Sequence, residues 1–176
     1  TPTYSYYAGQ VNLLEAFIHE ELYSEGQELC GELLTALQSS PFNLHYGRTL
    51  VLAAQLCLFD AKDWAGAMAY LTRAQAISRP VDSVHNLLIA KWMAIVESLE
   101  SRSVAPSLVG IRAQAVALKQ WETVRDCDFY LADLNDDRKA LIKLYFGTPH
   151  PSFRQRIGRR LGGEIPMTFT WGEPSA

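Results

Sequence analysis

Apolar residues recur at helical spacing along almost the entire chain, and this pattern constrains the fold more than any other feature. The stretch from Leu50 to Phe59 is nearly all apolar, which predicts a central helix buried on most sides. Strand signals are confined to Ile165–Trp171, where apolar and other residues alternate. The sequence therefore predicts an all-α fold with a short extended tail.

Proline, glycine and capping residues divide this pattern into nine expected helices. The last one is expected to begin at Pro149 after a Thr148 cap and to end at Gly162-Gly163. The short loops between helices favour antiparallel neighbours. We expect residues 1–147 to form one helical domain and residues 148–176 to form a capping helix and tail. The first eight helices are expected at about residues 9–23, 25–38, 43–59, 64–78, 83–100, 106–119, 121–134 and 138–146.

One helical hairpin carries a recognisable pattern of small and aromatic residues. After Ala53 it reads Lys62-Asp63-Trp64-x-x-Ala67-x-x-Tyr70-x-x-x-Ala74. This hairpin resembles a tetratricopeptide repeat, in which small residues lie where two helices approach closely and a large aromatic residue fills the gap to the next repeat. We therefore expect Ala67 and Ala74 to lie at a helix–helix crossing.

A second, weaker copy begins near Arg112 and aligns Lys119 and Trp121 with Lys62 and Trp64. Its expected small packing residues are Ala113 and Ala117. The offset between the copies exceeds the family's period of about 34 residues, so an extra helix, at about residues 83–100, should lie between them. The resemblance covers about residues 10–135 and implies stacked hairpins in a right-handed superhelix. The alternative is an irregular α-helical bundle.

No arrangement of residues in the sequence indicates a catalytic or metal site. His19-Glu20-Glu21 lacks the second histidine of a zinc-protease helix, and no Cys-x-x-Cys pair exists. The chain also lacks a glycine-rich phosphate loop, and its acidic cluster at residues 126–137 does not match a calcium loop. The three cysteines are expected to be buried apolar residues. We therefore expect a non-enzymatic protein without a cofactor.

The resemblance implies a concave surface that binds a protein or peptide partner. Polar or aromatic residues of the first helices of each pair, together with the arginines of the last helix, are the expected contacts. These candidates are Tyr46, Arg48, Lys91, Arg112, Arg154, Arg156, Arg159 and Arg160.

Charge is distributed unevenly along the chain. Residues 1–47 hold six glutamates and no lysine or arginine, whereas residues 138–163 hold seven basic residues and no acid. In an elongated array these ends would lie at opposite poles, which predicts salt-sensitive self-association through the helix that holds Arg154 to Arg160. The apolar stripe of that helix, Phe153, Ile157 and Leu161, predicts that it also caps the core.

Composition favours a cytoplasmic, soluble protein. The chain has an odd, sparse set of cysteines, no apolar run long enough for a membrane span and no signal-peptide pattern. It begins Thr-Pro-Thr, which suggests a piece of a longer protein. Degenerate helical arrays also occur in large bacterial transcription regulators, so the alternative function is a sensor or oligomerisation domain whose basic helix contacts nucleic acid. The acidic pI of about 5.8 makes nucleic acid the less favoured partner.

Overall fold

The computed structural model describes residues 2–163, of which 80% are helical and none lies in a strand. This confirms the all-α prediction; the strand expected at Ile165–Trp171 lies outside the described residues. A π-helical turn, Cys57–Ala61, extends the third helix. The nine α-helices of the described part are α1 Tyr4–His19, α2 Tyr23–Leu37, α3 Asn43–Leu56, α4 Trp64–Ile77, α5 Ser83–Ser101, α6 Pro106–Ala117, α7 Trp121–Leu134, α8 Arg138–Gly147 and α9 Pro151–Arg160.

Two expected helix starts were wrong. Helix α1 begins at Tyr4 rather than near Gly9, because the Thr3 hydroxyl accepts a hydrogen bond from the Tyr6 N–H at 3.3 Å and caps the helix earlier. Helix α9 begins at Pro151 rather than Pro149. Thr148 and His150 each precede a proline and adopt extended ψ angles of 133° and 117°, so the segment between them cannot be helical.

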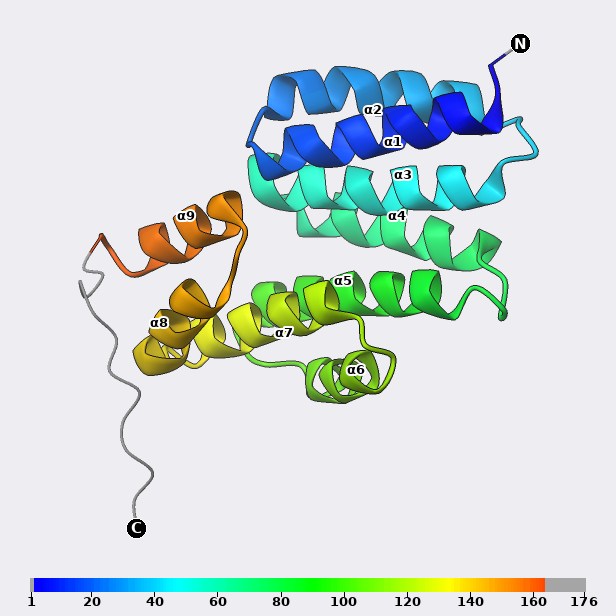
Figure 1. Ribbon diagram of the computed structural model, residues 1–176. Coiled ribbons are helices and arrows are strands. Elements are labelled where there is room, and N and C mark those ends of the chain that lie inside the picture. The colour runs from blue at the N-terminus through cyan, green and yellow to red at the C-terminus, as the bar shows by residue number, and fades with distance from the viewer. Residues whose placement is uncertain (1, 164–176) are drawn as a thin grey trace.

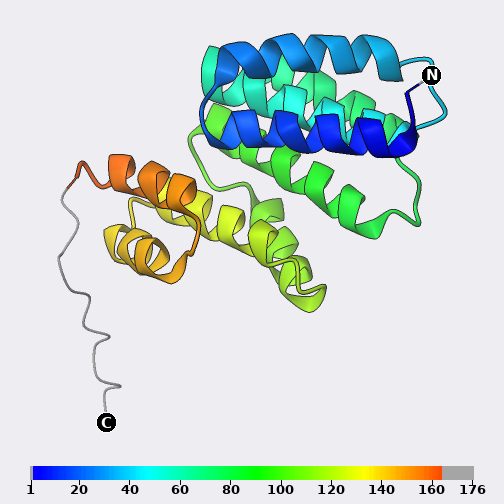
Figure 2. The same cartoon turned by 45° about the horizontal axis from the view of Figure 1, so that its top comes forward.

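Helices that follow one another in the chain pack together, and the odd-numbered helices α1, α3, α5 and α7 also pack on their odd-numbered neighbours. Figure 1 shows α1 to α5 stacked side by side. Figure 2, from another angle, shows α6 to α9 gathered beside this stack. The arrangement is compatible with a helical repeat, and its handedness as a superhelix stays a prediction.

Four helix–helix turns share one backbone conformation. In each, the residue two positions before the next helix has a left-handed φ: 61° at Glu21, 55° at Lys62, 55° at Lys119 and 52° at Asp136. Such a residue lets the chain reverse while late carbonyls of the first helix still accept hydrogen bonds. The expected equivalence of Lys62 and Lys119 is therefore seen in the backbone. Helix α5 lies between the two hairpins and packs against α4, α6 and α7, as expected of the extra helix.

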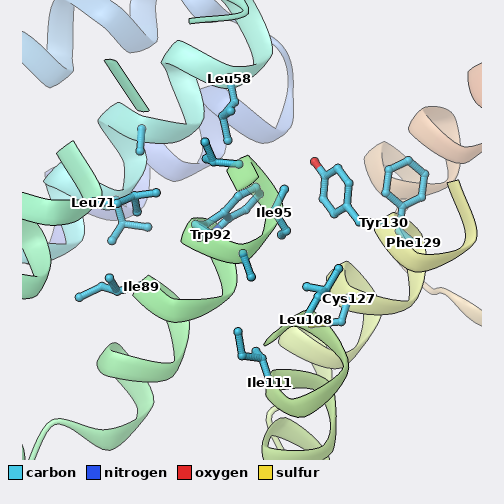
Figure 3. Packing of buried hydrophobic residues seen from close by; sticks show 14 of the residues in the cluster. Leu58, Leu71, Ile89, Trp92, Ile95, Leu108, Ile111, Cys127, Phe129 and Tyr130 are labelled. Carbon is cyan, nitrogen blue, oxygen red and sulfur yellow. The ribbon is translucent and has the colours of Figure 1, made fainter. Parts of the chain in front are cut away.

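Helix α3 is the centre of the molecule. Every residue from Thr49 to Leu56 is buried, as its apolar sequence predicted. One cluster of core residues includes Leu50 and Ala54, and a second includes Leu52 and Ala53, so α3 belongs to both. The first cluster continues into the C-terminal half, where Trp92 and Ile95 of α5 lie between Leu58 and Leu71 on one side and α7 on the other (Figure 3).

The prediction that small residues lie at helix crossings is confirmed in the first hairpin and wrong in the second. Ala67 and Ala74 are completely buried, whereas Ala113 and Ala117 are exposed. Helix α6 instead buries Leu108, Ile111 and Ala115. These positions are spaced by three and four residues, so they share one face of the helix. Ala113 and Ala117 lie on the opposite, exposed side.

Enlarging the buried alanines of α4 should destabilise the protein. We expect Ala67→Leu or Ala74→Leu to lower the free energy of unfolding by about 1–3 kcal/mol, because added methyl groups must displace packed neighbours. Urea denaturation measures this change. The matched control is Ala113→Leu, which adds the same atoms on an exposed helix face and should change stability by less than about 0.5 kcal/mol. Equal stability of all three variants would show that the α3–α4 crossing is not closely packed.

Candidate functional site

A groove of about 910 Å³ runs across the odd-numbered helices. Within the described residues, its lining comes from α1, α3, α5, α7 and α9 with the segments that lead into α7 and α9, and from no even-numbered helix. Helices α1, α3, α5 and α7 pack on their odd-numbered neighbours and present one inner face, and α9 borders it. The even helices α2, α4, α6 and α8 contribute nothing to this lining.

The groove floor is apolar with a few polar groups, and its rim is charged. Leu52, Gln55 and Trp92 are buried in the floor, whereas the Trp121 side chain at the start of α7 is 59% exposed. An exposed tryptophan beside a concave surface is the type of residue that most often dominates binding energy. The geometry favours contact with a larger molecule along the groove.

Three of the expected contact residues line this groove: Arg48, Lys91 and Arg156. Arg48 forms an ion pair with Glu15 at 3.2 Å, on the neighbouring helix α1. The Lys91 Nζ lies 2.5 Å from Asp126 and 4.7 Å from the centre of the Trp92 ring, and the residue is only 3% exposed. Lys91 therefore holds α5 against α7 and has little surface left for a partner.

The other expected contacts lie away from the groove lining. The Tyr46 hydroxyl accepts a hydrogen bond from Arg73 at 2.6 Å, on the α3–α4 side. Arg112 of α6 binds the carboxylate of Asp128 of α7, with its Nη2 at 3.2 Å. These two residues join neighbouring helices. Arg154, Arg159 and Arg160 are likewise absent from the groove lining.

The arginines of α9 contradict the expectation that the charged ends lie at opposite poles. Arg159 binds Glu21 with two hydrogen bonds, one of them 2.7 Å long, so basic and acidic ends meet within one molecule. Arg160 binds Asp133 and also Asp136, the latter at 3.1 Å. Figure 1 shows α9 beside the ends of α1 and α3, because the stack curves back on itself.

The remaining α9 contacts are also intramolecular. The Arg156 guanidinium lies 4.6 Å from the centre of the Phe59 ring, and Arg154 donates a hydrogen bond of 2.6 Å to the Thr148 carbonyl. Ile157 and Leu161 are buried, which confirms that the apolar stripe of α9 docks on the core. The expectation that the charged ends lie at opposite poles is therefore wrong for Arg159 and Arg160, which are paired with carboxylates of the same molecule, whereas among the described residues Arg154 and Arg156 contact only a carbonyl and an aromatic ring.

Sequence reasoning missed three groove residues. Gln55 was overlooked because it lies in a helical run dominated by apolar neighbours, whereas Thr123 lies among the charged residues of α7 and no sequence pattern distinguishes it. Trp121 was aligned with Trp64 in the repeat pattern, but Trp64 packs against the core whereas Trp121 is 59% exposed. A polar residue inside an otherwise buried helix face was the signal that could have identified Gln55.

No described group of His, Cys, Asp and Glu residues could hold a metal ion. Burial raises the pKa of the Cys30 thiol to about 12 and that of Cys127 to about 11, as expected of cysteines that pack as apolar residues. Among the described helices, none is long and apolar enough to cross a membrane.

Two buried histidines lie near a smaller cavity of about 270 Å³, which His85 lines. Burial lowers the pKa of both His45 and His85, and the nearby Arg48 cation lowers it further, while Asp82 acts in the opposite direction on His85. The His85 ring fits against α3 because residue 47 is glycine: a Cβ there would lie 2.7 Å from its Nε2 atom.

Stability should therefore fall on mild acidification. Below the ordinary histidine pKa of about 6.5, the unfolded chain takes up protons at His45 and His85 before the folded protein does, so the free energy of unfolding decreases as pH falls from about 7 toward 5. Urea denaturation at these two pH values measures the decrease. The double variant His45→Gln/His85→Gln should lose most of this pH dependence. An unchanged dependence in that variant would assign it to other groups.

The ion pair between α9 and the α1–α2 turn gives a direct prediction for Glu21. Its hydrogen bonds from Arg159 hold the pKa of the Glu21 carboxyl below its usual range. We expect Arg159→Gln to return this pKa toward about 4.3, as followed by NMR titration of the side-chain carboxyl carbon at low salt. The control Arg73→Gln, which removes an arginine bound to Tyr46, should leave it unchanged. Identical titration of Glu21 in all three proteins would mean that α9 and this turn do not meet in solution.

Comparison with known proteins adds no family to this description: no family model matches the chain, and neither the curated proteins nor the solved structures give a match. The structure by itself supports an all-helical domain whose sequence-adjacent packing is compatible with a helical repeat.

Proposed function

We propose that this chain is a non-enzymatic interaction module that binds a segment of a protein partner in the groove of the odd-numbered helices. The observation that carries the proposal is the groove itself, a continuous concave face about 910 Å³ in volume. Stacked helical hairpins commonly use such a face for binding, while the outer helices build the scaffold.

The lining supplies the kinds of side chain that a protein partner requires. Trp121 offers a large, rigid apolar surface at the rim, and Val84 of the same lining is half exposed. Arg48 and Arg156 add charged groups that can select a partner. A partner bound in the groove would cover the exposed part of the Trp121 side chain. We therefore propose that Trp121 supplies the main apolar contact with the partner.

The α9 helix gives little support to the alternative of a regulator segment that contacts nucleic acid. Its arginines already face Glu21, Asp133, Asp136, the Phe59 ring and a carbonyl oxygen. A phosphate backbone would have to compete with the carboxylates bound to Arg159 and Arg160, which leaves Arg156 as the groove-lining arginine of α9 without a carboxylate partner in the described part. We therefore propose a protein or peptide partner. If that partner is a second copy of this chain, the complex is a homo-oligomer.

Selection from a phage-displayed library of random dodecapeptides tests the proposal. We expect enriched peptides whose affinity for Trp121→Ala is roughly tenfold or more below that for the parent, because the main apolar anchor is lost. The matched control is Tyr6→Ala, since Tyr6 is also an exposed aromatic residue on an odd helix but lies outside the groove lining. Peptides should bind this control like the parent. Enriched peptides that bind the Trp121→Ala variant as tightly as the parent, or a selection that enriches no peptide, would argue against the groove as a binding site.

A further inference from the structure

Two polar side chains in the groove are almost completely buried and have no hydrogen-bond partner among residues 2–163. Gln55 of α3 is 8% exposed and Thr123 of α7 is 7% exposed, and both line the groove. By contrast, the hydroxyl of the buried Thr49, six residues before Gln55 on α3, donates to the His45 carbonyl at 2.8 Å. Gln55 and Thr123 are therefore groove residues whose polar atoms have no partner within the described residues but are still reached by solvent.

A partner that fills the groove must supply those hydrogen bonds, because displacing solvent from a buried polar group without replacing its hydrogen bond is costly. The amide of a glutamine donates hydrogen bonds through its NH2 group and accepts them through its carbonyl oxygen. The hydroxyl of a threonine can donate or accept a hydrogen bond. A helical segment satisfies its own backbone internally and offers nothing along its sides except side chains. An extended segment presents free N–H and C=O groups along its length.

The charges at the groove point to an acidic segment. Arg48, Lys91 and Arg125 each face a carboxylate within 4 Å. Lys119 and Arg156 also line the groove, and within the described residues neither has a carboxylate partner. Glu20, in the same lining, is likewise without an ion pair in the described part. The unpaired charge of the groove is thus two cations against one carboxylate.

We infer that the groove binds an extended, acidic segment of a protein partner, whose main chain hydrogen-bonds to Gln55 and Thr123 and whose carboxylates approach Lys119 and Arg156. This inference rests on the proposed function and specifies its ligand. The two residues that would bind the partner's main chain lie on α3 and α7, and both of these helices pack against α5. Charge then selects among the extended segments that fit.

The peptides enriched by the parent protein are the probes that test this inference. Each is measured against Gln55→Leu and Thr123→Val, which keep side-chain size and remove hydrogen bonding. We expect each variant to bind at least tenfold more weakly. Both variants should melt at or above the parent's temperature, because an apolar group replaces an unpaired polar one. The matched control Gln75→Leu makes the same change on the exposed face of α4 and should bind like the parent.

The backbone itself is tested by methylating each peptide nitrogen in turn. At one or more positions N-methylation should cost the parent at least tenfold in affinity, and the same peptide should lose less than threefold on the variant that lacks its hydrogen-bonding partner. Lys119→Gln and Arg156→Gln should each weaken binding, and raising sodium chloride from 50 to 500 mM should weaken it in the parent.

Other outcomes would overturn the inference while leaving the proposed function intact. One such outcome is a set of peptides that need Trp121 for binding and yet bind the Gln55→Leu and Thr123→Val variants as tightly as the Gln75→Leu control. Such peptides would exclude hydrogen bonding between the partner's main chain and Gln55 or Thr123. Peptides that gain helix content on binding, and bind more tightly when an i,i+4 staple fixes the helix, would identify a helical ligand. Enriched peptides that are basic would contradict the charge argument. Peptides that ignore Trp121 would instead overturn the proposed function and this inference together.

Discussion

The burial of α3 on all its sides is the constraint on which the rest of the structure depends. Every residue from Thr49 to Leu56 is buried, and the apolar ones belong either to the core shared with α1 and α2 or to the core shared with α4 and α5. A helix buried all round must be covered by neighbours on each side, so α3 organises the stack of α1 to α5. The groove follows from this position, because α3, between α1 and α5, supplies the middle of its floor.

The sequence predicted helices well because each depends on local spacing. The boundaries of α7 and the start of α4 agree with the periodicity and capping residues, and Asp63 caps α4 through a hydrogen bond of 2.9 Å to the Gly66 N–H. The turns were harder to interpret, since Glu21, Lys62, Lys119 and Asp136 adopt left-handed φ without being glycine. Tertiary packing of the two helices, and not the turn residue, imposes that conformation.

Long-range pairing could not be read from the sequence. Glu21 and Arg159 lie 138 residues apart, and no local pattern indicates that the stack curves until they meet. Lys91 was expected to face a partner because it is charged, yet Asp126 from another helix draws it into the α5–α7 interface. The groove itself has the same origin: Arg48, Lys91 and Arg156 were predicted as contact residues, but the surface that they share depends on how α3, α5 and α9 are placed.

The walls of the groove differ in how firmly they are held. Helices α3 and α5 are fixed by buried apolar residues, whereas α9 is anchored to the core by Ile157 and Leu161 and meets the α1–α2 turn and the π-turn through Arg159–Glu21 and Arg156–Phe59. Exposed ion pairs contribute only about 0.2–1 kcal/mol, and a cation–π contact at such a site contributes a similar amount. Losing both costs far less than separating α3 from its two cores, where each leucine-sized side chain contributes roughly 1.5–3 kcal/mol. The floor is therefore the most firmly held part of the groove, and the position of α9 depends on the burial of Ile157 and Leu161 more than on its two surface contacts.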